Sequence, residues 1–356
     1  MHIWTVHVDA VVRVVPVLGV NGGDPSDGVE KLSWLEAAYG PPTSFGLATV
    51  GAGLYVGPGD IKSPVGLTTD KILEGMISNI AKLATSAHGA YSDGNPVATY
   101  TTLASYYGMI LHAYEGGPDT STANEHMTNV TDAVLLIQAQ ASQDPRMAKV
   151  VEGIINTWYS WGAGLFNFFE LSAGTLLAPW GSYSLLWDMR VTDTPKARGL
   201  DSVVEAAAVP VTAGLALPVH GHPANQFVGC RGWHSIANCV GSFREKDGSL
   251  SPAGPLEWLP LNGTFNYLLR APSASRDCAL RVTVCSGASG TGSGNLEVSV
   301  GAFLPAQTVR VSATKGCVAT TFQPFSAARN GLVTLRLRVP TEQPGYVIDT
   351  IGAECS

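Results

Sequence analysis

The sequence predicts an α/β domain followed by an all-β domain. Up to about residue 206, short β-branched runs alternate with amphipathic stretches, which is typical of βα units around a parallel sheet. After residue 209 the pattern changes to short alternating runs that turn signals separate, which is typical of a β-sandwich. All the cysteines fall in this later part of the chain. We therefore predict an α/β domain over residues 1–206, a connector over 207–255 and a β-sandwich over 256–356.

Near-continuous apolar runs in the first domain predict parallel strands that are buried on both faces. These runs cover residues 13–20, 47–56, 109–114 and 165–170. Between them, apolar residues recur at three- and four-residue spacing, which predicts helices. The predicted helices cover residues 28–39, 70–87, 127–140, 147–161 and 195–205.

The last third of the chain contains short runs in which apolar and polar residues alternate, as they do in strands with one buried face. These runs cover residues 264–269, 280–284, 296–300, 307–311, 332–339 and 346–351. Turn signals such as Asn330-Gly331 separate them. The pattern predicts a jelly-roll-like β-sandwich, and the Gly- and Pro-rich stretch 218–255 before it is interpreted as a connector or an irregular edge.

The composition narrows the classes of function. Hydrophobic residues make up 45% of the 356 residues, which suffices for two domains with cores of their own. Only 14% of the residues are charged and the net charge is −7, so we expect no nucleic acid partner. The apolar run 11–20 contains Arg13 and is too short for a membrane span. No P-loop or Gly-x-Ser-x-Gly motif is present, we expect no cofactor, and an uncharged ligand suits the chain best.

Disulfides are expected in the second domain, because an even number of cysteines is confined to it. The cysteines are Cys230, Cys239, Cys278, Cys285, Cys317 and Cys355. Their spacing does not choose among the pairings, and the alternative of a zinc site lacks a C-x-x-C pair, so we expect no metal.

The glycosylation acceptors Asn129 and Asn262 agree with an oxidising compartment. We predict a secreted or cell-surface protein. Residues 1–20 lack the features of a signal peptide, so we expect either a mature chain or a start inside a longer protein.

A carboxylate follows directly on one of the predicted strands. The run 109–114 is followed by Glu115 and then by Gly116 and Gly117. In parallel α/β folds the active site forms at the carboxyl ends of the strands, where glycines let a ligand approach the backbone. Glu115 is therefore a candidate catalytic residue. The alternative is that it caps the strand at the solvent edge.

Several segments together resemble the C-terminal half of a TIM-barrel glycoside hydrolase of clan A. They are Tyr114-Glu115-Gly116-Gly117, Asp144-Pro145-Arg146-Met147, Gly164-Leu165-Phe166-Asn167-Phe168-Phe169, Trp180-Gly181-Ser182-Tyr183 and Asp193-Thr194-Pro195-Lys196. The resemblance covers residues 11–206 and implies a partial (β/α) barrel with the equivalents of strands five to eight. It implies that Glu115, at the end of the seventh strand, is the nucleophile. Candidate platforms on which sugar rings stack are Tyr55 and Tyr114 at strand ends and Trp180 and Trp187 after the last strand. The resemblance implies that Trp180 is the wall of a subsite and that Tyr55 is a hydrogen-bonding neighbour of the nucleophile.

The resemblance identifies no general acid/base in this chain. In the family that residue lies at the end of the fourth strand, and the chain has no equivalents of the first four strands. Asn124-Glu125 is the only Asn-Glu pair, and no predicted strand precedes it. Glu170 and Asp119 are the other candidates for a second carboxylate, although structural roles at a strand end and in a turn are the favoured interpretation.

The C-terminal domain resembles the β-sandwich carbohydrate-binding modules of glycosidases. The resemblance rests on Glu257-Trp258, Phe265-Asn266-Tyr267 and Gly345-Tyr346-Val347-Ile348-Asp349. It implies that Trp258 and Tyr267 stack on sugars. Both rings are equally compatible with packing between the two sheets.

Two hypotheses for the function follow. The first is a glycoside hydrolase that acts on a polysaccharide, with retention of configuration, and that is either truncated or inactive if the acid/base is missing. The second is a non-catalytic carbohydrate-binding or cell-surface protein. In either case a half barrel would expose the edges of strands 13–20 and 165–170, so homodimerisation through these edges is expected.

Overall fold

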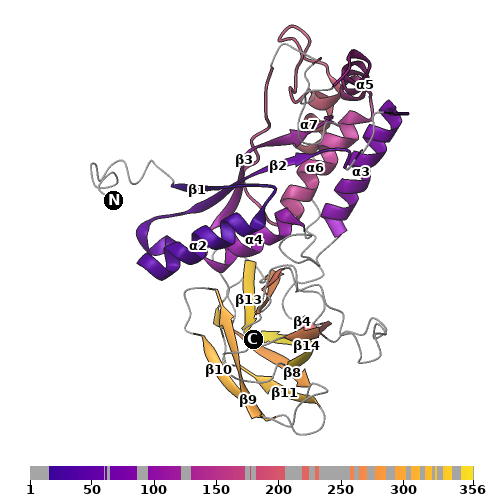
Figure 1. Ribbon diagram of the computed structural model, residues 1–356. Helices are drawn as coiled ribbons and strands as arrows, with labels where there is room; N and C mark the ends of the chain where they lie inside the picture. Colours follow the sequence, from indigo (N-terminus) through magenta and orange to yellow (C-terminus); the bar gives the residue numbers. More distant parts are fainter. Residues whose placement is uncertain are drawn as a thin grey trace, which may run out of the picture. The chain divides into compact units, whose positions relative to one another are not determined.

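The computed structural model describes residues 16–59, 61, 65–85, 95–121, 130–172, 177 and 182–204 (Figure 1). Beyond residue 204 it describes the β-strands that lie between residues 219 and 355, together with residues 301, 306 and 322. The chain divides into two compact units. One unit contains residues 1–50, 86–111 and 212–356, and the other contains residues 51–85 and 112–211. The boundary between the units therefore passes through two strands, β2 (Thr49–Val56) and β3 (Ile110–Pro118).

The α/β part of the chain holds a sheet with the strand order β1-β2-β3. The strands are β1 (Val17–Val20), β2 (Thr49–Val56) and β3 (Ile110–Pro118). The Ile110 N–H donates to the Ala48 carbonyl and, further along both strands, the Asp119 N–H donates to the Val56 carbonyl. Both numbers rise together, so β2 and β3 are parallel.

An extended segment, residues 165–169, lies along the other side of β3. Ala113 and Phe166 form a parallel bridge, and the Ala113 N–H donates to the Leu165 carbonyl at 2.8 Å. The segment is not a full strand, which differs from the predicted strand over 165–170. β3 is longer than the predicted run 109–114, so Glu115 lies within the strand. The mixed α/β class is as predicted, and the assignment to part of a barrel stays a prediction.

Helices flank this sheet. Each helix that the sequence predicts has a counterpart among the described residues. They are α2 (Pro25–Tyr39), α3 (Thr69–Thr85), α4 (Pro96–Tyr106), α5 (Asp132–Gln143), α6 (Met147–Ser160) and α7 (Pro195–Val204), with a short 3₁₀ helix, η1 (Pro42–Phe45). The sequence did not predict α4. All residues from Val97 to Tyr106 are buried, so α4 has no polar face to give a helical period. Its start is marked instead by Asn95, whose side chain accepts hydrogen bonds from the Val97 and Ala98 N–H groups.

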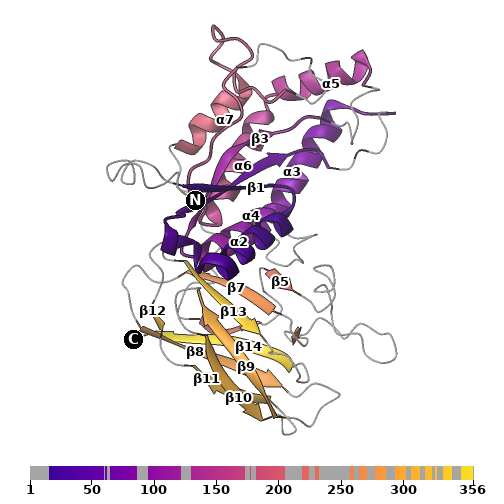
Figure 2. The same cartoon turned by 60° about the vertical axis from the view of Figure 1, so that its left-hand side comes forward.

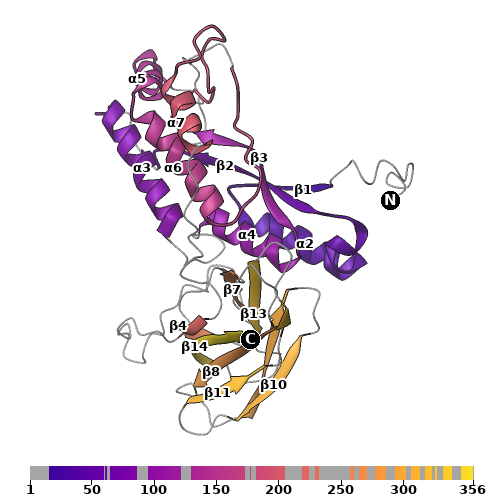
Figure 3. The same cartoon turned by 180° about the vertical axis from the view of Figure 1, so that it is seen from behind.

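Two tryptophans are the largest buried side chains of the second unit, in which α6 packs against α3 and α7 (Figure 3). Trp158 and Trp161 are 1% and 0% exposed. The Trp158 indole N–H donates to the Gly164 carbonyl at 2.8 Å, and that of Trp161 donates to the Leu83 carbonyl at 2.9 Å. Each indole therefore buries its ring without leaving its N–H unpaired.

We expect Gly199→Ala to destabilise this unit by about 1–3 kcal/mol, because α7 lies too close to α6 for a side chain. A Cβ at Gly199 would lie 2.3 Å from the carbonyl oxygen of Ala148, and backbone cannot move aside without shifting a helix. Urea unfolding followed by circular dichroism measures the change. Gly19→Ala is the control, since a Cβ there meets nothing within 4 Å. Equal unfolding midpoints for the two variants would contradict the close approach.

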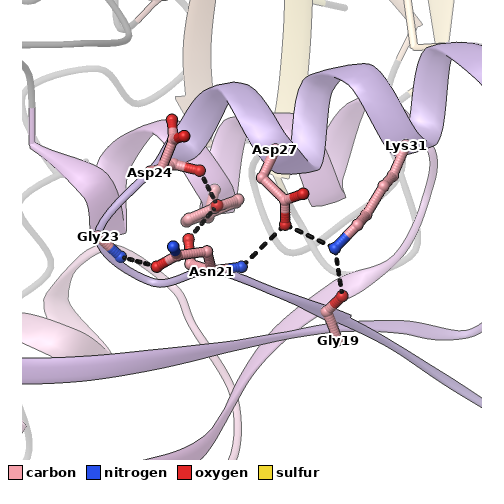
Figure 4. A network of polar contacts seen from close by, with 7 residues as sticks. Gly19, Asn21, Gly23, Asp24, Asp27 and Lys31 are labelled. Carbon is pink, nitrogen blue, oxygen red and sulfur yellow. Dashed lines mark hydrogen bonds and ion pairs between the residues drawn. The ribbon is translucent and has the colours of Figure 1, made fainter.

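In the first unit, a polar network fixes the turn between β1 and α2 (Figure 4). The Asp27 carboxylate accepts hydrogen bonds from the Asn21 N–H at 3.0 Å and the Lys31 ammonium at 2.6 Å. Lys31 also donates to the Gly19 carbonyl at 3.3 Å. The hydroxyl of Tyr100, from α4, lies 2.5 Å from the Asn21 carbonyl oxygen. The network satisfies the polar groups of the turn and joins it to α4.

The C-terminal part of the first unit is a β-sandwich of antiparallel strands (Figure 2). Among the described strands, one sheet has the order β10-β9-β13-β7-β5 and the other has the order β11-β8-β14-β4, with β12 paired to β8 and β6 paired to β14. The strands are β4 (Val219–Pro223), β5 (Gly229–Arg231), β6 (Glu257–Leu259), β7 (Thr264–Arg270), β8 (Asp277–Cys285), β9 (Ser293–Val300), β10 (Gln307–Ser312), β11 (Cys317–Thr321), β12 (Phe325–Ser326), β13 (Leu332–Arg338) and β14 (Tyr346–Cys355). The stretch that the sequence predicts as a connector, 207–255, contributes β4 and β5 to the sandwich.

Alternate residues of the sandwich strands form its core, as the period of two predicts. The buried apolar side chains include Leu268, Leu280, Val282, Leu296, Val298, Leu335, Leu337 and Ile351. Strand β13 also contacts α4 of the same unit. The Thr334 hydroxyl donates to the Thr102 carbonyl at 3.0 Å, and the Arg336 guanidinium lies 3.8 Å from the centre of the Tyr106 ring.

Candidate active site

The backbone of β3 is irregular at Glu115. The Asn167 N–H donates to the Ala113 carbonyl at 3.1 Å, and the Phe169 N–H donates to the Gly116 carbonyl at 2.8 Å. A step of two residues on the 165–169 segment therefore matches a step of three residues on β3, so β3 holds one extra residue between Ala113 and Gly116. The hydrogen bonds between β2 and β3 show the same excess of one residue. Such a β-bulge re-aims side chains and is common next to active sites.

Glu115 lies against Tyr55 of the neighbouring strand. The Tyr55 hydroxyl donates a hydrogen bond to the Glu115 carboxylate. Burial, the charge of Glu115 and this hydrogen bond raise the pKa of Tyr55 above its usual range, which keeps the hydroxyl protonated as a donor. Gly53 leaves the space, because a Cβ there would lie 3.3 Å from the Tyr114 hydroxyl and 3.7 Å from the Cγ of Glu115. The side chains of Tyr114 and Glu115 therefore extend over Gly53 of the neighbouring strand.

Three aromatic rings form a cluster beside Glu115. The ring centres of Tyr55 and Tyr183 are 5.3 Å apart, those of Phe169 and Tyr183 are 5.9 Å apart, and those of Tyr55 and Phe169 are 6.3 Å apart. All three pairs meet edge to face, the arrangement that aromatic quadrupoles favour. Phe169 is 37% exposed, so the cluster offers apolar ring surface next to a carboxylate.

A second carboxylate, that of Asp119, lies just after the end of β3. Its Oδ1 accepts a hydrogen bond from the Ser121 N–H at 2.8 Å, and the carboxylate also accepts one from the Tyr183 hydroxyl. Burial raises the pKa of Asp119 above its usual range, against the opposing effects of these two donors and of the charge of Lys196. Burial and then the charge of Asp119 raise the pKa of Tyr183, and the charge of Glu115 adds to this rise. Tyr183 therefore lies within the electrostatic reach of both carboxylates.

A lysine that interacts electrostatically with Asp119 is fully buried. Lys196, the second residue of α7, is 0% exposed, and its ammonium group donates to the Ser182 carbonyl. The Ser182 N–H donates in turn to the hydroxyl of Thr120 at 3.3 Å. Burial lowers the pKa of Lys196 to about 7, and the nearby charge of Asp119 opposes this shift. The lysine thus anchors the segment that carries Tyr183.

The structure describes some of the predicted site residues and not others. Tyr114 is 47% exposed and lies beside Glu115 on β3, and Trp187 is half-buried in the segment before α7. The Glu170 carbonyl accepts a hydrogen bond from the Leu185 N–H at 2.7 Å, which ties down the end of the 165–169 segment. Trp180 and Asn124-Glu125 lie outside the described residues. The substrate-binding roles of Tyr114, Trp180 and Trp187 stay predictions.

In the sandwich, the structure corrects one candidate for sugar stacking. Tyr267 is 1% exposed and lies opposite Leu335 in the pairing of β7 with β13, so its ring is part of the core and has no face open to a ligand. Trp258 lies in β6, opposite Val347 of β14, and stays a prediction. Cys239 and the glycosylation acceptors Asn129 and Asn262 lie outside the described residues.

The part of the chain that the structure describes contains no group of three or more His, Cys, Asp or Glu side chains with the geometry to hold a metal ion. Among the same residues, no helix combines the length and the apolar character that crossing a membrane requires.

Sequence reasoning assigned no role to Tyr183 or Lys196 beyond the segments that contain them, and it favoured a structural role for Asp119. One signal was available for Lys196. The positive end of the helix dipole disfavours a cation in the first turn of α7, so a lysine there calls for a partner elsewhere in the fold. The contact between Tyr183 and Asp119 joins residues far apart in the chain, and no local pattern marks it.

No protein-family model and no curated protein matches this chain. Among solved structures, a family 35 carbohydrate-binding module from Clostridium thermocellum matches 28% of this chain and 74% of its own, with 14% identity and a TM-score of 0.24. A module from Clostridium stercorarium, in complex with cellobiose, matches 40% of this chain and 96% of its own, with 12% identity and a TM-score of 0.29. The chain spans 22% of an exo-β-1,3-galactanase from Phanerochaete chrysosporium, which matches 27% of this chain with 14% identity and a TM-score of 0.23. Identities and TM-scores this low assign neither a family nor an activity to the chain.

Proposed function

We propose that this chain is a carbohydrate-active protein that hydrolyses a glycosidic bond, with Glu115 as its essential carboxylate. The main support is the position of Glu115 at the bulge of β3, where Tyr55 hydrogen-bonds to it and the rings of Tyr55, Tyr183 and Phe169 lie beside it. Glycoside hydrolysis needs a carboxylate at the anomeric carbon, and aromatic rings provide the broad apolar contact that a sugar ring requires.

Tyr55 has a defined part in this proposal. Its hydrogen bond to Glu115 orients the carboxylate that would accept a proton or attack a carbon centre. Backbone hydrogen bonds of Ala113 and Gly116 to the 165–169 segment flank Glu115, which supports the same role, because a misplaced catalytic group loses most of its effect.

The test is hydrolysis of a panel of aryl glycosides and plant and microbial polysaccharides. We expect Glu115→Gln to lower kcat/KM by about 100-fold or more on every substrate that the wild type cleaves, since general acid–base groups contribute roughly 10²–10⁴-fold. Glu74→Gln is the matched control, because Glu74 is exposed on α3. Equal rates for wild type and Glu115→Gln would refute the assignment, and no hydrolysis of any substrate would refute the proposed activity.

A second candidate function is carbohydrate binding without catalysis. Asp119 accepts hydrogen bonds from the Ser121 N–H and the Tyr183 hydroxyl, and such bonds suit a carboxylate with a purely structural role. If Asp119 is structural, the site lacks the second carboxyl group that glycoside hydrolysis uses, which favours binding alone. Titration calorimetry with the same polysaccharides separates the two functions, because binding without turnover in the wild type supports the second.

Other properties stay predictions within this proposal. Cys278 lies opposite Cys355 and Cys285 lies opposite Cys317 in the backbone register, and Cα atoms of opposite residues are about 4.5–5.5 Å apart, which is within the span of a disulfide. This register supports disulfides in the sandwich and, with them, secretion or display on the cell surface. Homodimerisation through exposed strand edges also stays a prediction.

A further inference from the structure

A polar side chain, that of Asn167, lies beside Glu115 on the neighbouring 165–169 segment and on the same face of the sheet. Resting on the proposed function, we propose that Asn167 is a substrate-binding residue whose carboxamide hydrogen-bonds to the sugar hydroxyl next to the anomeric carbon. This contact would help to determine which sugars the site accepts. The backbone register, the direction of the side chain and its chemistry support the proposal in turn.

The backbone register places Asn167 directly beside Glu115. The carbonyl groups of Ala113 and Gly116 flank the bulge of β3, and they accept hydrogen bonds from the N–H groups of Asn167 and Phe169. Glu115 belongs to the stretch of β3 between these two bonds, so Asn167 is its neighbour on the adjacent segment. Neighbouring strands of a sheet lie about 4.8 Å apart. One sugar ring can therefore contact both side chains.

Alternation along the segment turns the Asn167 side chain away from the helices. Phe166 and Phe168, its two neighbours, pack against a cluster of buried side chains from α6 and α7. Successive side chains of an extended segment point to opposite faces, so that of Asn167 points to the other face of the sheet. The exposure agrees, because Leu165, Asn167 and Phe169 are exposed and the two residues between them are half-buried.

Glu115 lies on this same face. The ring of Phe169, two residues beyond Asn167, contacts the ring of Tyr55, and the Tyr55 hydroxyl donates to Glu115. The Glu115 side chain extends over Gly53 of β2, which lies on the opposite side of β3 from the 165–169 segment. It therefore leaves Asn167 uncovered, and a ligand that reaches Glu115 from this face also lies over the carboxamide.

The chemistry of the side chain suits a neutral sugar hydroxyl. Asn167 is the only polar side chain in the run 164–169, and asparagine is disfavoured in such apolar, strand-like runs, so a local preference is broken beside the proposed site. An amide both donates and accepts hydrogen bonds, as a hydroxyl does. In the proposed function Glu115 acts at the anomeric carbon, and the hydroxyl nearest to that carbon is on the adjacent ring carbon. A group beside Glu115 meets this hydroxyl first.

Removal of the hydroxyl from the substrate tests this assignment. The 4-nitrophenyl glycoside that the wild type cleaves fastest is compared with its 2-deoxy counterpart, which lacks only this hydroxyl. We expect Asn167→Ala to lower kcat/KM by at least about 10-fold on the parent glycoside, because hydrogen bonds to this hydroxyl strengthen in the transition state. On the 2-deoxy glycoside the loss should be less than about 3-fold, because the contact is missing in both proteins. Damage to folding would lower both rates by the same factor and so cannot imitate the expected result.

Leu165→Ala is the matched control, since Leu165 is 57% exposed on the same face of the same segment and carries no polar group. It should change both rates by the same factor. Inhibition by the free sugar and by its 2-deoxy form repeats the comparison without turnover of the deoxy compound. Equal losses of Asn167→Ala on both glycosides, or no loss on either, would overturn the role of Asn167 while the proposed function stands. If the wild type hydrolyses no glycoside and no polysaccharide, the proposed function fails and this assignment fails with it.

Discussion

Trp158→Ala is expected to lower the free energy of unfolding of the α/β part by about 3–5 kcal/mol. The ring is 1% exposed, and it meets the Phe166 ring edge to face at 5.5 Å between centres. Truncation removes these contacts and opens a cavity between α6 and the 165–169 segment. It also removes the indole donor from the partly buried carbonyl of Gly164, which adds to the loss.

Urea unfolding followed by circular dichroism at the helical band measures this loss, because most of the described helices belong to the α/β part. Tyr159→Ala is the matched control, since Tyr159 is the next residue of α6 and is 38% exposed. Trp158→Phe should fall between them, as it keeps a ring and loses the hydrogen bond. A loss below about 1 kcal/mol for Trp158→Ala would show that the segment is held by other contacts.

Trp158 also connects stability to the proposed site. Phe166, its ring partner, lies in the segment that pairs with β3, and a Cβ at Gly116 would lie 2.8 Å from the Phe166 ring. Since Gly116 directly follows Glu115, loosening this segment should disturb the bulge. We therefore attribute the position of Glu115 partly to the packing of Phe166 between Trp158 and Gly116.

Much of the fold followed from periodicity. The helices from α2 to α7 with a polar face were predicted, as were the longer sandwich strands, because each buries one face and leaves the other in water. The prediction failed where that contrast is missing. α4 is buried all round, and the 165–169 segment has the apolar character of a strand but makes too few ladder bonds to be one.

The site was predicted only in part, for a similar reason. Glu115 stands out because a charged residue within an apolar run is costly unless it is used. Tyr55 was a candidate platform for a sugar ring, and only the family resemblance implied that it neighbours the nucleophile. The bulge that aims Glu115 depends on pairing with two neighbouring strands, and the sequence of β3 alone does not contain that register. The partnership of Asp119 with Tyr183 and Lys196 is likewise tertiary.

The pH dependence of stability should reveal Lys196. Its pKa is about 7 in the folded chain and 10.5 in the unfolded chain, so between these values the unfolded chain binds the extra proton. Stability therefore rises with pH in this window, by at most about 1.4 kcal/mol per pH unit for one proton. From about pH 7 to about pH 9.5 we expect the wild type to gain roughly 3 kcal/mol.

Lys196→Met removes the titrating group and keeps most of the buried volume, so its stability should lack this rise. The comparison uses the slope with pH, because the absolute stability of the variant also includes the lost hydrogen bond to the Ser182 carbonyl. The window ends near pH 9.5 because Tyr55 and Tyr183 have raised pKa values in the folded chain, and ionisation of tyrosines in the unfolded chain lowers stability at higher pH. Parallel slopes for wild type and Lys196→Met would mean that the amine is as well solvated in the folded chain as in water, and the anchoring of the Tyr183 segment by a buried lysine would then be wrong.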